Sequence, residues 1–284
     1  MNLNMSISEQ LVHSTVRIEC QLQNKQWSTG TGFFFNFHFI NDGTQFPVIV
    51  TNKHVIGNSI IGKFLLTLED KNGLPIIGEH IPVTIDNFES YWIPHPNENV
   101  DLCIMPVGPV INSAKDSGYE IFYKGFDENL LPSKDQLKEI NIIDDIIMVG
   151  YPNGIWDSVN NMPIVRKGIT ATSPELNYNG KEEFLIDAAC FPGSSGSPVV
   201  LYNEGGYTAR SGKTYLGKPR LMLLGILFAG PQFTVNGEVS VVDIPTSQRV
   251  MIHSSIPNNL GYVIKSSRIL DFKEICMNLS KSAI

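Results

Sequence analysis

Residues 185–200 read LIDAACFPGSSGSPVV, a stretch that places Ser194 and Ser195 between Gly193 and Gly196. Apolar segments precede and follow the glycines, so the stretch predicts a turn between two β-strands. A serine hydroxyl becomes a nucleophile when a base accepts its proton and nearby donors receive the negative charge that develops. Glycine permits a tight turn in which the amide groups of Gly193 and Ser195 converge on one small hollow. This pattern fits an acyl-transfer enzyme, although an ordinary Gly/Ser hairpin loop has the same local composition.

Two upstream segments supply candidates for a base and for a residue that orients it. Residues 47–55 read PVIVTNKHV, a β-branched strand that runs directly into His54. Residues 99–107 read NVDLCIMPV, with Asp101 at the start of another apolar strand. Taken singly, a histidine at a strand end is commonly a surface residue, and an aspartate before a strand is a common turn residue. The order His54, Asp101, Ser195 is that of the chymotrypsin-type triad, whereas subtilisins and α/β-hydrolases use other orders.

Together these segments resemble the trypsin-like, chymotrypsin-fold serine peptidases, most closely the bacterial HtrA-type branch without its PDZ domains. The resemblance extends with insertions from about residue 10 to residue 275, and it rests on residues 28–33, 51–55, 100–104, 149–154, 165–169, 187–198 and 259–264. It implies an all-β fold of two packed antiparallel six-stranded β-barrels with a C-terminal helix. We expect residues 1–115 to form the barrel with His54 and Asp101, 116–140 the connection, 141–265 the barrel with Ser195, and 266–284 the helix.

Length and patterning agree with this architecture. At 284 residues and 42% apolar composition, the chain can bury two small barrel cores. Residues 31–40, 47–51, 64–69 and 222–228 have the composition of strands, and helical spacing is confined to residues 8–16, 134–140 and 266–279. In the last segment the apolar side chains predicted to form a packing face are Ile269, Phe272, Ile275, Cys276 and Leu279. Residues 203–220 are expected to be a hairpin excursion from the second barrel, and residues 231–258 either an extra hairpin beside the active-site cleft or a plain surface elaboration.

The expected compartment follows from cysteine usage and charge. The four cysteines, Cys20, Cys103, Cys190 and Cys276, are widely separated, without zinc-ligand spacing. Residues 1–16 have no signal-peptide pattern, and the nearly apolar stretch 221–231 is too short to cross a bilayer. We therefore expect a cytoplasmic bacterial enzyme with free thiols and no membrane partner. The net charge of −7 disfavours nucleic acid as a partner.

The resemblance also implies roles for individual residues. Ser195 would attack the carbonyl carbon of a peptide bond, His54 would act as general base and then general acid, and Asp101 would orient His54. The amides of Gly193 and Ser195 would form the oxyanion hole. The substrate would be a protein or peptide, and no metal or cofactor is implied. A regulatory partner is one way to restrain a cytoplasmic protease, and the insertion at residues 231–258 is one place where it could bind.

The specificity pocket is expected to accept an apolar side chain. Ala189 lies six residues before the nucleophile, at the pocket floor in this family, where trypsins that cut after Arg or Lys carry an aspartate. The walls would come from Phe228, Ala229, Gly230, Gly261 and Tyr262. An alanine floor offers no charge to pair with a buried cation, and an unpaired buried cation is costly.

Two departures from the family pattern concern the nucleophile turn. Ser194 stands where digestive members carry an aspartate that pairs with a freed N-terminus, so that activation switch cannot operate here. Ser197 replaces a common glycine.

Two other functions are compatible with parts of the sequence. An α/β-hydrolase would use Ser195, Asp243 and His253, but it requires a helix directly after the nucleophile, where residues 198–201 favour a strand. A catalytically inactive peptide-binding or scaffold module of the same fold is the second alternative.

Overall fold

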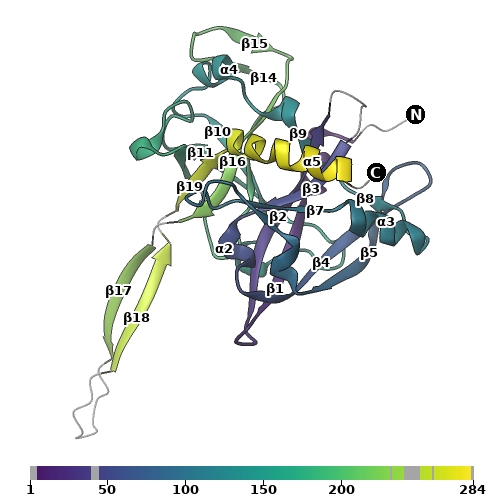
Figure 1. Ribbon diagram of the computed structural model, residues 1–284. Helices are drawn as coiled ribbons and strands as arrows, with labels where there is room; N and C mark the ends of the chain where they lie inside the picture. Colours follow the sequence, from purple (N-terminus) through teal and green to yellow (C-terminus); the bar gives the residue numbers. More distant parts are fainter. Residues whose placement is uncertain (1–4, 40–44, 231, 240–249, 258, 283–284) are drawn as a thin grey trace, which may run out of the picture.

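The computed structural model describes residues 5–39, 45–230, 232–239, 250–257 and 259–282. The second half of the chain closes into an antiparallel barrel of six strands (Figure 1), in the order β10-β11-β12-β19-β16-β13. Their bounds are Asp145–Gly150 (β10), Ile164–Thr170 (β11), Glu183–Asp187 (β12), Pro198–Asn203 (β13), Arg220–Ala229 (β16) and Leu260–Lys265 (β19). The six-stranded barrel predicted for this half is confirmed.

The first half forms a sheet that does not close among the described residues. Its main path has the order β5-β4-β1-β2-β3-β7-β6, with β8 paired to β4 and β9 paired to β2. The bounds are Thr15–Leu22 (β1), Trp27–His38 (β2), Gln45–Thr51 (β3), Ser59–Glu69 (β4), Pro75–Asp86 (β5), Ile93–Pro94 (β6), Cys103–Pro106 (β7), Ile121–Phe122 (β8) and Phe126–Asp127 (β9). The prediction of a second closed six-stranded barrel is therefore not confirmed here.

The gap in the first sheet has a local cause. The edge strand β6 is only two residues long and ends in Pro94, which has no N–H to donate to a neighbouring strand. A groove of about 850 Å³ separates the edges, lined by β5, by Met105 and Pro106 of β7, and by helix α3 (Gly108–Asp116).

Helices are short and lie at the ends and connections. Their bounds are Ile7–Val12 (α1), Lys53–Ile56 (α2), Lys134–Lys138 (α4) and Lys273–Ser282 (α5), with 3₁₀ turns at Phe88–Tyr91 (η1), Glu128–Leu130 (η2), Pro152–Gly154 (η3), Tyr178–Gly180 (η4) and Ser266–Phe272 (η5). Ser6 and Glu9 form a capping box that begins α1. None of the helices among the described residues is both long and apolar enough to span a membrane.

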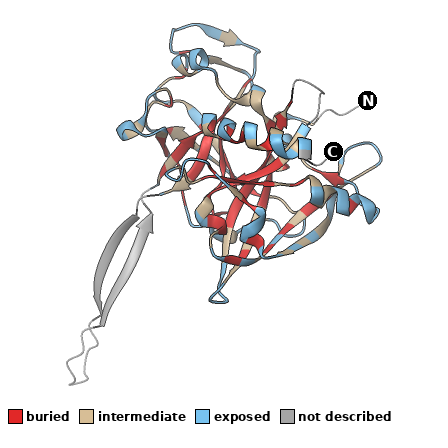
Figure 2. Cartoon of the chain, viewed as in Figure 1, coloured by how far each residue is buried: buried red, intermediate tan, exposed pale blue. Residues whose placement is uncertain are grey.

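The closing segment η5–α5 packs largely as its spacing predicts. Ile269, Phe272 and Cys276 are fully buried, and Ile275 is half-buried. Leu279 is 39% exposed, so the packing face ends about one turn earlier than expected. The buried side chains belong to a core that also contains Phe33 of β2 and residues of the second barrel, and Figure 2 shows this buried zone running across both halves.

Two hairpins extend from the second barrel. β14 (Gly206–Thr208) pairs with β15 (Thr214–Leu216) inside the predicted 203–220 excursion. Within the 231–258 insertion, β17 (Gln232–Val239) pairs with β18 (Val250–Pro257) and projects away from the body (Figure 1).

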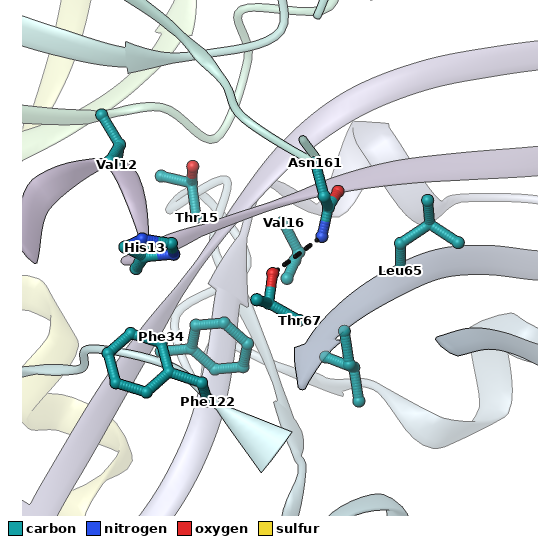
Figure 3. A pocket seen from close by; sticks show the side chains of 10 residues that line it. Val12, His13, Thr15, Val16, Phe34, Leu65, Thr67, Phe122 and Asn161 are labelled. Atoms are coloured by element: carbon teal, nitrogen blue, oxygen red, sulfur yellow. Dashed lines mark hydrogen bonds between the residues drawn. The ribbon is translucent and has the colours of Figure 1, made fainter. Parts of the chain in front are cut away.

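A side-chain contact ties the loop before β11 to the first sheet. In Figure 3 the Asn161 amide reaches from that loop to the Thr67 hydroxyl on β4, and the two atoms are 3.1 Å apart. The cavity beside this contact, also lined by His13 and Phe122, holds about 10 Å³. That is room for about one water molecule, and none of the predicted catalytic residues lines it.

Candidate active site

His54 and Asp101 lie in direct contact. His54 is the second residue of α2, directly after strand β3, and Asp101 lies two residues before β7, which pairs with β3. The Nδ1 atom of His54 is 2.5 Å from Oδ2 of Asp101, and the backbone N–H of His54 donates to Oδ1 at 3.2 Å. An ionised carboxylate only accepts hydrogen bonds, so in the neutral imidazole Nδ1 carries the proton and Nε2 the free lone pair. This arrangement leaves Nε2 able to accept a proton.

A buried asparagine fixes the backbone at Asp101. The Asn52 side chain is fully buried, and its Nδ2 donates to the Asp101 carbonyl oxygen at 2.8 Å. Asn52 also precedes α2 as its N-cap residue. One side chain therefore links the start of the histidine helix to the aspartate loop. Nothing in the sequence pattern distinguished Asn52 from the neighbouring turn residues.

The nucleophile turn, residues 191–197, is held in place by hydrogen bonds that its carbonyl oxygens accept. Ser194 N–H donates to Phe191 O at 3.0 Å, Asn153 N–H to Pro192 O at 2.6 Å, and Ser197 N–H to Ser194 O at 3.0 Å. From the first sheet, Thr31 supplies the rest: its hydroxyl donates to Gly193 O at 2.9 Å, and its N–H to Ser195 O at 2.9 Å. All five carbonyls from residue 191 to residue 195 therefore have donors.

Two amide donors of the turn have no protein acceptor among the described residues, namely the N–H groups of Gly193 and Ser195. In a trans peptide the C=O and N–H groups point in opposite directions. The bonds to Pro192 O and Ser194 O therefore also fix the directions of these two N–H groups. Gly193 has φ +83°, a left-handed conformation that glycine adopts without strain. The turn thus presents two fixed donors of the kind that an oxyanion requires.

The Ser195 hydroxyl is not bonded to His54 in this structure. Its Oγ donates to the carbonyl oxygen of Phe228 at 3.5 Å, and the described residues contain no hydrogen bond between Ser195 and His54. The segments that carry the two residues are nevertheless adjacent. A Cβ on Gly196 would lie 2.5 Å from Oγ1 of Thr51, three residues before His54.

A pocket of about 120 Å³ lies beside Ser195, and its lining agrees in part with the expected specificity pocket. Ala229 and Gly230 line it as predicted. Phe228 contributes its carbonyl to Ser195, and its ring lies 6.1 Å from that of Tyr262. Gly261 lies behind the pocket, where a Cβ would be 2.7 Å from Sγ of Cys190.

Ala189 is not among the lining residues of this pocket, and its carbonyl oxygen accepts a hydrogen bond from Arg166. Four lining residues were not predicted: Cys190, Phe191, Pro192 and Leu227. Cys190, Phe191 and Pro192 directly precede Gly193 in the sequence. Their position beside the predicted nucleophile could therefore have indicated that they line the pocket.

The α/β-hydrolase arrangement does not agree with the fold. The segment after Ser195 is strand β13 of an antiparallel barrel, where that arrangement requires a helix. Asp243 lies outside the described residues, as does the side chain of His253.

Comparison with known proteins agrees with this geometry. Residues 30–207, more than half of the chain, match the family model of the trypsin-like peptidase domain. The chain belongs to the trypsin-like peptidase family. As a trypsin-like peptidase it is a serine endopeptidase, a hydrolase of peptide bonds. Comparison with curated proteins gives no match.

Solved structures similar to this trypsin-like peptidase include HtrA-type proteases. The HtrA-type protease AlgW, solved with a tripeptide, has a TM-score of 0.50 and 13% identity, over 95% of this chain and 62% of AlgW. This trypsin-like peptidase therefore spans less than two thirds of AlgW. The serine endoprotease of Yersinia pestis has a TM-score of 0.49 and 14% identity, over 98% of this chain and 68% of that one. The Rv3671c protease of M. tuberculosis, in its active form, has a TM-score of 0.42 and 13% identity, over 91% and 78%.

All four cysteines are free and buried. The expected cytoplasmic location stays a prediction, as do the expected absences of a metal, a cofactor and a nucleic-acid partner.

Proposed function

We propose that the protein cleaves peptide bonds through an acyl-enzyme on Ser195, with His54 as general base and Asp101 as its orienting carboxylate. The Ser195 hydroxyl rotates from the Phe228 carbonyl to Nε2 of His54, which accepts the proton as Oγ attacks the substrate carbonyl carbon. The protonated imidazole then donates to the leaving amine, and water hydrolyses the acyl-enzyme by the same route. In this proposal residues 1–115 supply the base and residues 141–265 supply the nucleophile.

The observation that carries the proposal is the pair of free amides at Gly193 and Ser195, fixed by the bonds on every carbonyl from residue 191 to residue 195. Donors that are already aligned cost no reorganisation when negative charge develops on the substrate oxygen, and each contributes on the order of 3 kcal/mol. A surface hairpin has no need of two fixed, unpaired amides beside a histidine–aspartate pair.

We further propose that cleavage follows an apolar residue. The pocket beside Ser195 has an apolar lining that includes Leu227 and Ala229, with no carboxylate among its lining residues. A substrate Lys or Arg would therefore lose its hydration without gaining a counter-charge.

A fluorophosphonate probe tests the acyl-enzyme mechanism. The wild-type protein should be labelled at one serine, and Ser195→Ala and His54→Ala should each abolish labelling. Asp101→Asn should slow labelling by about 10⁴-fold, the effect expected when the histidine tautomer is no longer fixed. Ser280→Ala and His38→Ala are matched controls outside the site and should react normally.

The outcomes separate the alternatives. A folded wild-type protein that binds peptides but is never labelled would be a scaffold module of this fold. Labelling that survives His54→Ala and disappears in His253→Ala would support the other hydrolase arrangement. A peptide library then tests the pocket, and cleavage mainly after Arg or Lys would refute the proposed apolar preference.

A further inference from the structure

Arg166 is a partly buried arginine whose guanidinium contacts the nucleophile turn. It lies on β11 between two exposed residues, Val165 and Lys167, so its side chain points into the barrel. Its Nη1 atom donates to the Ala189 carbonyl oxygen at 2.5 Å and to Oγ of Ser194 at 2.8 Å. One nitrogen therefore joins the two ends of the segment 189–194.

The surroundings of Arg166 do not compensate its charge, so the residue is expected to destabilise the folded protein. Its Nε and Nη2 atoms are buried and have no hydrogen-bond partner, and no carboxylate pairs with it among the described residues. Burial lowers the pKa of its guanidinium to about 10, so the group still carries its charge at neutral pH. A buried cation without a counter-charge destabilises a fold.

A fully packed arginine in the same barrel, Arg220, provides the contrast. Nη2 of Arg220 lies 3.0 Å from each carboxylate oxygen of Asp144, and its Nε donates to Asn203 at 2.9 Å. Arg220 therefore has the partners that a stabilising buried arginine needs, whereas Arg166 has only the turn.

The Ser194 side chain connects the Arg166 guanidinium to the backbone of the turn. Ser194 is fully buried, and its Oγ accepts from Arg166 and also from Phe191 N–H at 3.4 Å. Its N–H returns a bond to Phe191 O at 3.0 Å. The guanidinium thus closes the loop of residues that contains the Pro192–Gly193 peptide, whose N–H is one of the two free donors.

We propose that Arg166 is a positioning residue for the oxyanion hole: through Ser194 and Ala189 it holds the turn in which the Gly193 and Ser195 amides face the substrate carbonyl. This inference rests on the proposed function, because it assigns a purpose to Arg166 only if those amides receive an oxyanion. It also explains why an incompletely paired cation is retained behind the active site.

The test compares Arg166→Met with two controls. Lys167→Met removes the same charge from the neighbouring position, where the lysine is exposed and pairs with Asp145 at 2.8 Å. Arg220→Met removes a buried arginine that has a carboxylate partner. For each variant kcat and KM are measured on a peptide anilide with an apolar residue before the bond, together with the Tm. Affinity is measured for a peptide aldehyde, whose adduct with Ser195 bears an oxyanion, and for the matching peptide alcohol, which forms no adduct.

For Arg166→Met we expect kcat to fall about 100-fold, the size of the loss when one oxyanion donor is removed. Aldehyde affinity should fall by a similar factor, while KM and alcohol affinity change less than about twofold. The Tm should stay the same or rise. Lys167→Met should leave every value near wild type, and Arg220→Met should lower the Tm.

Unchanged kcat and aldehyde affinity in Arg166→Met would overturn the inference. So would a Tm below that of the wild type or a failure to fold, because either result makes Arg166 a structural residue. A wild-type protein that reacts with neither the fluorophosphonate nor the aldehyde would instead refute the proposed function.

Discussion

The Thr31 hydroxyl donates to the carbonyl oxygen of Gly193 across 2.9 Å, which joins strand β2 of the first sheet to the nucleophile turn of the second barrel. The Thr31 hydroxyl oxygen also accepts a hydrogen bond from the backbone N–H of Tyr151 at 3.2 Å. One threonine side chain therefore connects the two halves of the molecule at the point where the proposed reaction takes place. The 193–194 peptide, next to the free Gly193 N–H, is therefore held only while both halves are docked.

Thr31→Val should reduce kcat/KM by about tenfold or more. Valine keeps the shape of threonine and removes the donor to Gly193 O, so the peptide that follows the free Gly193 N–H is no longer fixed and the oxyanion donors are held less rigidly. Stability should also fall by about 1–3 kcal/mol, because the buried Tyr151 N–H loses its acceptor. Peptide hydrolysis and urea denaturation measure the two effects. Thr84→Val, on exposed β5, is the control, and equal activity in both variants would contradict the prediction.

Stability should decline above pH 9 because of buried thiols. Burial raises the pKa of Cys20 and Cys276 from 9.0 to about 12 each, and that of Cys190 to about 11. Between pH 9 and pH 11 the unfolded thiols lose protons that the folded ones keep. The free energy of unfolding should therefore fall by up to about 1.4 kcal/mol per pH unit for each thiol, while below pH 9 this contribution is fully present.

Urea denaturation at pH 8, 9, 10 and 11 measures this slope. Cys276→Ala should reduce the slope of the free energy of unfolding against pH by the contribution of one thiol. The variant should also be less stable at pH 8, because alanine leaves a cavity in place of the sulfur. A slope that does not change in Cys276→Ala would show that another group causes the decline.

The sequence allowed the prediction of the histidine, aspartate and serine because each lies in a short segment whose composition reports its local structure. Arg166 could not be found in this way. It stands beside Lys167 in a strand, and only the folding of residues 189–194 against β11 distinguishes the partly buried cation from the exposed one. Ser194, where digestive members of the family carry an aspartate, predicted the loss of their activation switch, but not which residue contacts that position. The open edge of the first sheet was not predicted, because the expected barrel took no account of Pro94, which ends the edge strand β6 after two residues.

Ser197→Ala should raise the free energy of unfolding by about 1 kcal/mol. The Ser197 side chain is fully buried, and its Oγ has no hydrogen-bond partner. Alanine removes the unpaired hydroxyl and keeps the Cβ. Ser59→Ala is the matched control, because the buried Ser59 hydroxyl donates to Ile56 O at 2.5 Å, and its loss should destabilise by about 1 kcal/mol. Thermal denaturation compares the two, and destabilisation by both substitutions would contradict the assignment.

Gly196→Ala should unfold or inactivate the protein far more than the same change at Gly212. Both glycines have left-handed backbones, with φ +87° at Gly196 and φ +83° at Gly212, so alanine is strained by about 1 kcal/mol at either position. At Gly212 a Cβ would meet nothing within 4 Å. At Gly196 it would collide with the Thr31 carbonyl oxygen, which accepts from Thr51 at 2.6 Å and belongs to the strand that holds the nucleophile turn. The difference in Tm between the two variants therefore isolates the packing of the turn against the first sheet. Equal Tm values, with fluorophosphonate labelling retained in both variants, would mean that the turn does not need this close approach.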